Sequence, residues 1–552
     1  MRASCFVLLG ALVCATTLAQ CQKAFPPDQV TIRSIVASGR LADLRWPNFS
    51  DQRVSADNFY KPSYQAAWIR KGAPTTQALA VIDIFKHADE EGLNAEDYDG
   101  PRWPDRIETL QAEHSSGDEA RFDAALTVCA MRYVSDVRVG RVNPKHVNFG
   151  FDVGPKKLNL AQFLRDKLVN GEDVKGALSS IEPPFDGYKR TRTTFLHYMD
   201  LARTDDAQPL PVPAKTVGAG DAYAGIPRLA HLLVMFGDLP ASAAGAVDES
   251  VYKEPLVRAL QNFQLRHGLP HDGRLNQETI DELNKPLSFR VEQLRLTLER
   301  WRWLPLTYAQ PPIVVNLPEF FLRAYDAQRK LGLSMNVNVG AAYEHETPVF
   351  EDRMSYIVFR PYWDVPPSIQ RNEIVPDIEA DRDYIKENNF EVISADGKLV
   401  TSGTVSDSVL QQIRAGKFRV RQKPGPSNAL GLVKFIFPNV FSVYLHDTPQ
   451  EKEMFAEARR DLSHGCIHVQ EPDQLAAWVL RDKPEWTLER VQQAMHNGPD
   501  NARVNLTKPI PVLILYGTAV VEDDGEVFFY HDIYGHDATL EKALAKGYPY
   551  PR

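Results

Sequence analysis

The chain has 552 residues, a length that allows about three or four domains, each with an apolar core. Hydrophobic residues make up 43% of the sequence and charged residues 24%, as in ordinary globular proteins. The net charge of -9 argues against nucleic acid as a partner, because neutralising phosphates requires clustered Lys and Arg.

Residues 1–20 have the pattern of a secretory signal peptide. Arg2 precedes an apolar run from Cys5 to Leu18, and small residues follow it. The run is too short to span a bilayer as a mature helix, and no later stretch is apolar for long enough. We therefore expect an exported protein of the periplasm or cell envelope, with no integral membrane segment after signal cleavage. An LAQC sequence ending at Cys21 also resembles a lipoprotein cleavage box, so a lipid anchor at Cys21 is an alternative.

Residues 28–215 are predicted to form a mostly helical domain. Gly92 follows a helix-prone stretch and is a typical helix stop. The apolar helical pattern of residues 124–133 surrounds Cys129, so this cysteine is expected to pack in a core. A linker with Pro and Gly is expected over 205–221. We interpret the domain as a spacer without chemistry of its own.

A small helical module is predicted over residues 225–286. Leu260 and Phe263 belong to the apolar stripe of one helix, which Gly268 ends. Asn276 has the position of an N-cap for the next helix. A linking helix is expected to follow, with its apolar face at Val291, Leu294, Leu298 and Trp301.

A mostly β domain is predicted over residues 306–522, and residues 523–552 form a C-terminal extension. Residues 313–316 and 335–339 alternate as strands do, and residues 434–437 lead into another strand. Many short strands with few helices favour a β-sandwich-like fold. The chain as a whole is therefore predicted to be a multidomain α+β protein.

Residues 369–428 interrupt the rhythm of the strands. The first half of this insertion is charged and helix-prone, and Asp396-Gly397 in the second half is typical of a hairpin turn. The insertion is expected to be a subdomain within the β domain. A surface decoration with no gating role is an alternative.

Two short stretches carry the chemically informative residues, YLHD at 444–447 and SHGCIHV at 463–469. We interpret them as one active site with Cys466 as nucleophile and His446 as base, because a cysteine attacks as its thiolate. Residues 441–446 are predicted to form a strand in which Tyr444 and His446 point the same way. The same rule aligns Cys466 with His468 if the chain there is extended. Of the five cysteines, only Cys129 and Cys466 lie in regions predicted to fold, which fits a reactive thiol rather than a disulfide framework.

Gly465 permits a close backbone approach, as an oxyanion pocket made of N–H groups at Gly465 and Cys466 requires.

Two other interpretations of the cysteine and the histidines are possible. A buried structural cysteine flanked by core histidines is one alternative. A zinc site made of His446, His464, Cys466 and His468 is another, but ligands at every second position of one strand do not easily converge on a tetrahedral ion. We therefore expect no metal and no cofactor.

The order and spacing of these residues resemble a family signature. His446, sixteen further residues and then Ser463-His464-Gly465-Cys466 resemble the L,D-transpeptidase pattern of a histidine followed by [Ser/Thr]-x-Gly-Cys. The resemblance implies that Cys466 is the acyl-accepting nucleophile and His446 its base. It also implies a pocket lined by Tyr444, Ser463, His464 and Gly465. The family usually has Arg or Asn two residues after the cysteine, whereas this chain has His468, which is only partly charged near neutral pH and whose role stays open.

Other segments resemble parts of the large multidomain L,D-transpeptidases. Residues 28–215 resemble their N-terminal scaffold, and residues 225–286 resemble a peptidoglycan-binding module, with glycan binding itself left open. Residues 369–428 correspond to an inserted lid over the active site. The resemblance implies peptidoglycan stem peptides and glycan as partners, and a mostly β catalytic domain.

The resemblance also implies a reaction. Cys466 would attack a donor stem tetrapeptide and form a thioester, and a diaminopimelate amine of a neighbouring stem would complete a 3→3 cross-link. Carbapenems are expected to acylate the same cysteine. Two alternatives stay open: an L,D-carboxypeptidase or endopeptidase with the same thiolate, and a non-enzymatic wall-binding protein.

Overall fold

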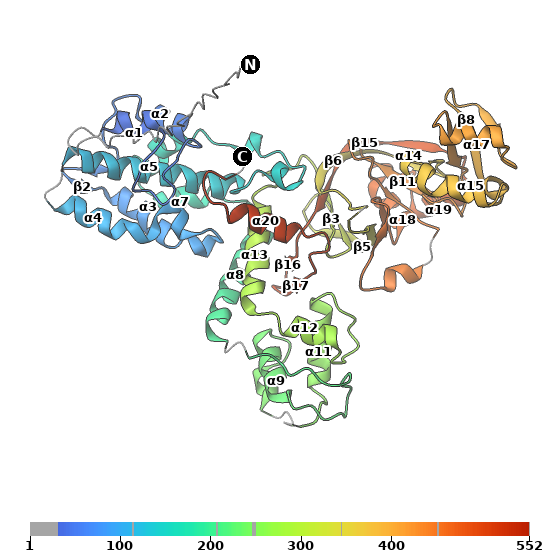
Figure 1. Ribbon diagram of the computed structural model, residues 1–552, viewed down its shortest axis with the longest axis horizontal. Helices are drawn as coiled ribbons and strands as arrows, with labels where there is room; N and C mark the ends of the chain where they lie inside the picture. Colours follow the sequence, from blue (N-terminus) through green and yellow to red (C-terminus); the bar gives the residue numbers. More distant parts are fainter. Residues whose placement is uncertain are drawn as a thin grey trace, which may run out of the picture.

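The computed structural model describes most of the chain. The described residues are 31–112, 115–205, 208–245, 250–343, 345–449 and 452–550. The predicted signal peptide and Cys21 lie outside them. Figure 1 shows a helical N-terminal domain, a small helical module, and a β-rich domain with a further lobe at its far end. The predicted multidomain α+β organisation is therefore confirmed. Among the described residues, no helix is both long and apolar enough to cross a bilayer.

The N-terminal domain is built around α5 (Ser116–Val139), which is buried along most of its length. The Ser115 side chain caps this helix by accepting a hydrogen bond from the Asp118 N–H. Cys129 lies in the surrounding core as a free, buried thiol, in agreement with the expected packing role. The other helices are α1 (Ile32–Ser38), α2 (Arg53–Tyr60), α3 (Thr76–Lys86), α4 (Trp103–Gln111), α6 (Leu160–Phe163) and α7 (Val174–Ser179). Helix α8 (Asp186–Thr204) follows them, but its buried residues lie in the core of the small module. The shorter elements are β1 (Ile69–Arg70), β2 (Ala73–Pro74), η2 (Ala88–Glu91), η3 (Ala95–Tyr98), η4 (Gly100–Arg102), η5 (Pro144–Val147), η6 (Gly154–Lys156) and η7 (Leu164–Val169).

The small module has the helical pattern that the sequence predicted. The Asn276 side chain accepts from the Thr279 N–H, and Gly268 has a left-handed φ of 65° just after a helix. The module contains α9 (Ile226–Met235), α10 (Ala241–Ala244), α11 (Leu256–Arg266) and α12 (Gln277–Leu283). A hairpin from the C-terminal region, β16 (Ala519–Val521) and β17 (Val527–Phe529), packs in the same apolar core. The far end of the chain thus completes this module.

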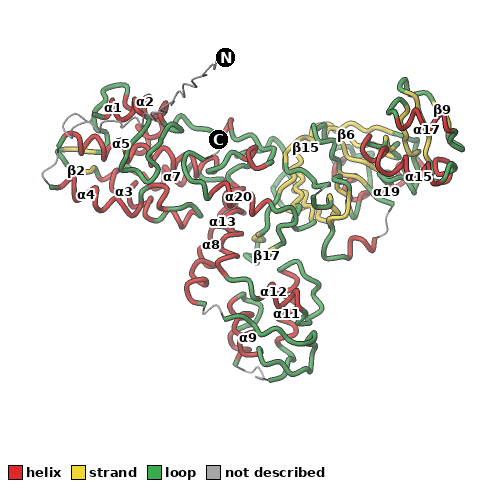
Figure 2. The backbone as a smooth tube through the Cα atoms, viewed as in Figure 1, coloured by secondary structure: helices red, strands yellow, loops and turns green. Residues whose placement is uncertain are grey.

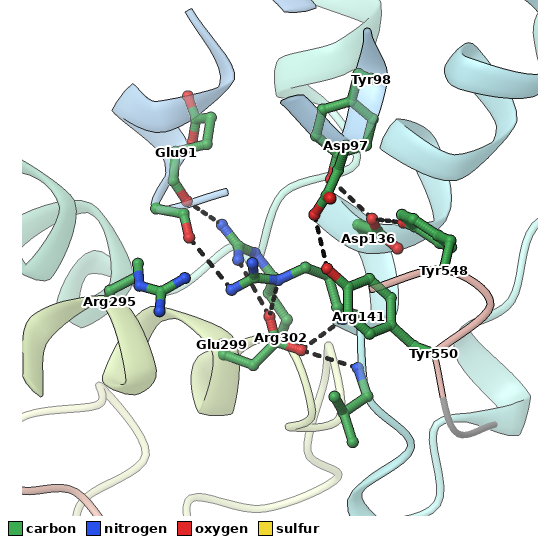
Figure 3. A network of polar contacts seen from close by, with 12 residues as sticks. Glu91, Asp97, Tyr98, Asp136, Arg141, Arg295, Glu299, Arg302, Tyr548 and Tyr550 are labelled. Atoms are coloured by element: carbon green, nitrogen blue, oxygen red, sulfur yellow. Dashed lines mark hydrogen bonds and ion pairs between the residues drawn. The ribbon is translucent and has the colours of Figure 1, made fainter. Parts of the chain in front are cut away.

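Helix α13 (Leu287–Trp301) joins the domains through buried charges (Figure 3). The Glu299 carboxylate accepts hydrogen bonds from the backbone N–H groups of Arg141 and Val142, at 2.5 and 3.1 Å. It also pairs with the guanidinium groups of Arg141 and Arg302 at 3.3 and 3.6 Å. The three charged side chains are at most 1% exposed, so removing one of them would leave an uncompensated buried charge.

The C-terminal extension returns to the N-terminal domain. Helix α20 (His536–Leu544) packs against α13 and η5. Beyond it, the Tyr548 hydroxyl donates to Asp136 and the Tyr550 hydroxyl donates to Asp97 at 2.6 Å, which Figure 3 also shows. Residues 523–550 therefore tie the module, the linking helix and the N-terminal domain together.

The β-rich domain contains a nine-stranded sheet that closes on itself. In Figure 2 its strands are the main group of yellow segments. The strand order is β13-β5-β14-β12-β11-β6-β15-β3-β4, and β5 also pairs with β4. Strand β5 contacts β4 through its first half and β14 through its second half. The sequence predicted a β-sandwich-like fold. The structure instead has a ring of paired strands around one apolar core. The strands are β3 (Ile313–Asn316), β4 (Phe321–Tyr325), β5 (Leu331–Gly340), β6 (Phe350–Phe359), β11 (Val433–Ile436), β12 (Leu445–His446), β13 (Asp461–Ser463), β14 (Ile467–Val469) and β15 (Ala502–Leu515), accompanied by η9 (Lys452–Ala456), α18 (Pro472–Val479) and α19 (Leu488–Asn497).

The chain between β6 and β11 folds into the lobe at the far end of Figure 1, here called the inserted subdomain. It has its own apolar cluster, in which Ile378, Val392 and Val420 are fully buried. Gly397 makes the predicted hairpin turn with a φ of 81°. The subdomain contains a four-stranded sheet in the order β7-β10-β8-β9. Its elements are β7 (Trp363–Asp364), α14 (Pro367–Ile369), η8 (Gln370–Ile374), α15 (Val375–Ala380), α16 (Tyr384–Glu387), β8 (Phe390–Ser394), β9 (Leu399–Thr401), α17 (Asp407–Arg414) and β10 (Phe418–Gln422).

Candidate active site

Two adjacent strands carry the histidines that flank the cysteine. Strand β12 pairs in parallel with β14, so that Leu445 lies beside Ile467 and His446 beside His468. Leu445 and Ile467 are fully buried in the core of the ring. Because neighbours along a strand alternate in direction, the histidines project from the opposite face of the sheet.

The strand expected over residues 441–446 is shorter than predicted. Only Leu445 and His446 are in β12. Ser442 has a φ of 56°, which an extended strand does not allow. The Asn439 side chain donates to the carbonyl groups of Phe437 and Val443 at 2.7 and 2.8 Å and thereby holds a loop. Hydrogen bonding by this asparagine outweighs the apolar alternation that suggested a strand.

The Cys466 side chain is partly buried at the start of β14. Its Sγ lies 3.9 Å from the Ser442 carbonyl oxygen, to which the thiol donates. Burial raises the pKa of the Cys466 thiol, while the Tyr444 backbone N–H and the Lys434 ammonium lower it. The thiol is therefore protonated in the resting protein at neutral pH.

His446 is buried and neutral. Burial lowers the pKa of its imidazole to about 4, with a partial opposing effect of its hydrogen bond to Asp447 and a further lowering by Lys434. Its Nδ1 lies 2.5 Å from the Asp447 carbonyl oxygen. A carbonyl oxygen only accepts, so Nδ1 carries the proton and Nε2 has the free lone pair. The imidazole is thus in the form that can accept a proton.

His468 is also neutral. Burial lowers the pKa of its imidazole well below the usual value, and His446 and His464 lower it further. The two rings, of His446 and His468, have centroids 4.7 Å apart. Asn338 on β5 places its side-chain amide 3.2 Å from Nδ1 of His468. A neutral His468 does not supply the positive charge of an arginine at this position.

The turn before the cysteine is held by side-chain hydroxyls. Ser463 Oγ donates to the Cys466 carbonyl at 2.5 Å and accepts from the Gly465 N–H at 3.1 Å. Thr347 Oγ1 donates to the Gly465 carbonyl at 2.9 Å. Gly465 has a φ of 106°, which favours glycine. The Gly465 N–H, expected as an oxyanion donor, is engaged with Ser463 in this arrangement.

His464 points to the inserted subdomain. Its Nε2 lies 3.0 Å from a carboxylate oxygen of Glu373 in η8. Its ring centroid is 4.5 Å from that of His345. Both side chains of the ion pair are about half exposed, at 48% and 47%. His464 therefore connects the turn that carries the cysteine to the inserted subdomain.

The sequence interpretation missed several residues of the site. Lys434 on β11 lies directly opposite His446 on the same face, and its pKa is lowered by burial. It is the lone charge in an otherwise apolar strand, and that signal was available from the sequence. Asn338, Thr347 and Glu373 are far from the cysteine in sequence, and no local pattern points to them. Among the described residues, no cluster of His, Cys, Asp and Glu could hold a metal ion.

Comparisons with known proteins agree with this organisation. Residues 55–194 match a "Scaffold domain", residues 228–283 a "Putative peptidoglycan binding domain", and residues 310–513 an "L,D-transpeptidase catalytic domain". A relative from Haemophilus influenzae described as "Putative L,D-transpeptidase" is 30% identical over 296 residues. That match covers 52% of this chain and 58% of the relative, so the similarity spans somewhat more than half of either protein.

Proposed function

Because the chain belongs to the L,D-transpeptidase family, we propose that it cross-links peptidoglycan by acyl transfer through Cys466. The donor is a stem tetrapeptide and the acceptor is the diaminopimelate amine of a neighbouring stem. The observation that carries the proposal is that Cys466 directly precedes β14, whose His468 lies beside His446 on β12, and that the His446 imidazole is neutral.

The first half of the reaction forms a thioester. His446 Nε2 takes the proton of the Cys466 thiol as the sulfur attacks the carbonyl of the third stem residue. The new C–S bond forms and the amide C–N bond breaks. The imidazolium then returns the proton to the leaving amine, and D-alanine departs. Since the pKa of the thiol is raised and that of the imidazole is lowered, the resting pair is neutral and the proton moves during the attack.

The second half of the reaction releases the enzyme. The diaminopimelate amine attacks the thioester carbonyl, a new amide bond forms and the C–S bond breaks. The amine proton passes to His446 and the thiol is regenerated. The Cys466 backbone N–H is the proposed donor to the oxyanion in both halves, because the Gly465 N–H is bonded to Ser463. Lys434 adds a positive charge that favours the attacking thiolate.

The inserted subdomain supports a role as a lid. A thioester must be kept from water until the amine arrives, and a covered site does this. The contact of Glu373 with His464 brings the subdomain to the turn that carries the cysteine. The match of the helical module to a peptidoglycan-binding domain supports binding to glycan. A protein that binds and cross-links peptidoglycan would act in the periplasm or cell envelope. Carbapenem acylation of Cys466 belongs to the same proposal.

The test uses the purified chain with tetrapeptide muropeptides, and a Cys466→Ala variant as control. Cross-linked dimers that are absent with the variant support the proposal. Trimmed monomers alone would point to the carboxypeptidase, in which water resolves the thioester. If intact-protein mass shows no meropenem adduct and neither product forms, the protein is a wall-binding protein without this activity.

A further inference from the structure

The peptide unit that joins Gly465 to Cys466 is held at one of its two polar ends. It is a trans peptide, so its C=O and N–H groups lie in one plane and point in opposite directions. The Gly465 carbonyl accepts a hydrogen bond from Thr347 Oγ1 at 2.9 Å. The Cys466 N–H, the proposed oxyanion donor, has no hydrogen-bond partner among the described residues. Whatever fixes the carbonyl end therefore fixes the direction of the N–H.

Thr347 is itself held by Gly340, the last residue of β5. The Gly340 N–H donates to Thr347 Oγ1 at 2.9 Å, so this hydroxyl both accepts and donates. Gly340 also pairs with Ser463 on β13. A Cβ atom on Gly340 would lie 2.9 Å from the Gly465 Cα, which is too short for two carbon atoms. The backbone of Gly340 is thus packed directly against the turn that carries the cysteine.

Tyr534 of the C-terminal extension joins these two residues. Its hydroxyl donates to the Gly340 carbonyl at 2.5 Å and accepts from the Thr347 N–H at 3.3 Å. Burial raises the pKa of the Tyr534 phenol to about 12, so the hydroxyl keeps its proton at neutral pH and remains a donor. One oxygen atom therefore ties the residue that packs on Gly465 to the residue that bonds its carbonyl.

The position of Tyr534 is fixed from the linking helix. Its backbone N–H donates to the Tyr516 hydroxyl at 2.9 Å, and that hydroxyl donates to the Asp532 carboxylate at 2.6 Å. The other oxygen of Asp532 accepts from the Asp537 N–H at 3.0 Å. The Asp537 carboxylate pairs with Arg300 of α13 at 2.5 Å, and both side chains are largely buried. The phenol is therefore attached to the rigid part of the protein and not to the inserted subdomain.

We propose that Tyr534 is a positioning residue, which acts through Thr347 to orient the Gly465–Cys466 peptide whose N–H stabilises the oxyanion. The inference rests on the proposed function for the reaction, whereas the order of the turn can be measured without it. An accepted hydrogen bond at the carbonyl also polarises the peptide and makes its N–H a stronger donor. Without the Tyr534 hydroxyl, Gly340 and Thr347 lose their common partner and the peptide plane can rotate.

The first experiment compares two reactions of the same sulfur in the full chain carrying Tyr534→Phe. Meropenem acylation is followed by intact-protein mass over a range of concentrations, which gives a binding constant and a maximal rate. The maximal rate should fall about ten- to a hundredfold, because a small misplacement of a catalytic group has an effect of that size. The binding constant should stay unchanged. Alkylation by iodoacetamide should also keep its rate, since substitution at a saturated carbon forms no oxyanion.

Tyr550→Phe is the matched control. It removes another buried tyrosine hydroxyl from the same extension, one that donates to Asp97 in the N-terminal domain at 2.6 Å. Thermal unfolding should show a loss of stability at least as large as that of Tyr534→Phe, while meropenem acylates the control at the native rate. A native rate of acylation in Tyr534→Phe would overturn the inference. Equal slowing of acylation and alkylation would overturn it too, because general damage to the site would then explain both.

The second experiment measures the turn without any reaction. Backbone hydrogen exchange over residues 461–469, read by mass spectrometry, should be faster in Tyr534→Phe than in the native chain and in Tyr550→Phe. Equal exchange in the three proteins would show that Tyr534 does not hold the turn. If meropenem fails to acylate the native chain while the difference in exchange is present, the proposed function fails and the positioning of the turn by Tyr534 stands.

Discussion

His464 and Glu373 join the turn that carries the cysteine to the inserted subdomain, with Nε2 and the carboxylate oxygen 3.0 Å apart. The two residues are 91 positions apart in the sequence. The contact is half exposed, so its free energy is small, about 0–1 kcal/mol. A contact of that strength suits a subdomain that must open for substrate and close during the reaction.

The first prediction concerns this contact. Glu373→Gln should let the inserted subdomain open more often, and alkylation of Cys466 by a small thiol reagent should accelerate about two- to fivefold. Asp407→Asn is the control, since it breaks an exposed ion pair with Arg382 inside the subdomain. If the two substitutions accelerated alkylation equally, the contact between His464 and Glu373 would not be what holds the subdomain closed.

The second prediction concerns pH. Protonation of His446 removes the base, and burial moves its pKa to about 4, below that of an exposed histidine. Burial moves the pKa of the Cys466 thiol upward. The rate of carbapenem acylation should therefore be nearly flat from pH 6 to pH 8 and fall only as the pH approaches 4. A loss of half the rate near pH 6.5 would show that an ordinary histidine, or a resting thiolate–imidazolium pair, governs the reaction.

The third prediction concerns Lys434. Its ammonium favours the thiolate, so Lys434→Met should raise the pKa of Cys466 and slow its alkylation at pH 8 several-fold. The measurement is the pH dependence of iodoacetamide labelling, located at Cys466 by peptide mass. Lys434→Arg retains the charge and should keep the native midpoint. A midpoint unchanged in Lys434→Met would remove Lys434 from the site.

The fourth prediction concerns the joint between domains. Glu299→Gln keeps the shape of the side chain but leaves the buried Arg141 and Arg302 without their counter-charge, at a cost of about 3–5 kcal/mol. Calorimetry should show a lower unfolding temperature, and limited proteolysis should cut earlier near the domain joint. Glu292→Gln on the same helix is the control, because its pair with Arg295 is more exposed and contributes about 0.2–0.5 kcal/mol.

Much of the fold could be predicted because its signals are local. The cap at Asn276, the turn at Gly397 and the β-rich run at residues 434–437 depend on neighbours within a few residues. The strand at residues 441–444 was wrong because the Asn439 side chain closes a loop there. The closure of the sheet also escaped prediction. It depends on β5 pairing both with its sequence neighbour β4 and with β14, whose His468 is 130 positions from Asn338.

The sequence by itself determined the chemical groups of the site: a thiol, imidazoles at short spacing and a glycine that permits the turn. Tertiary structure alone decided their state. His446 and His468 are neutral because the folded chain buries them, and burial is a property of the whole domain. It alone also set Lys434 opposite His446, because register between strands is fixed by pairing across the sheet and not by distance along the chain.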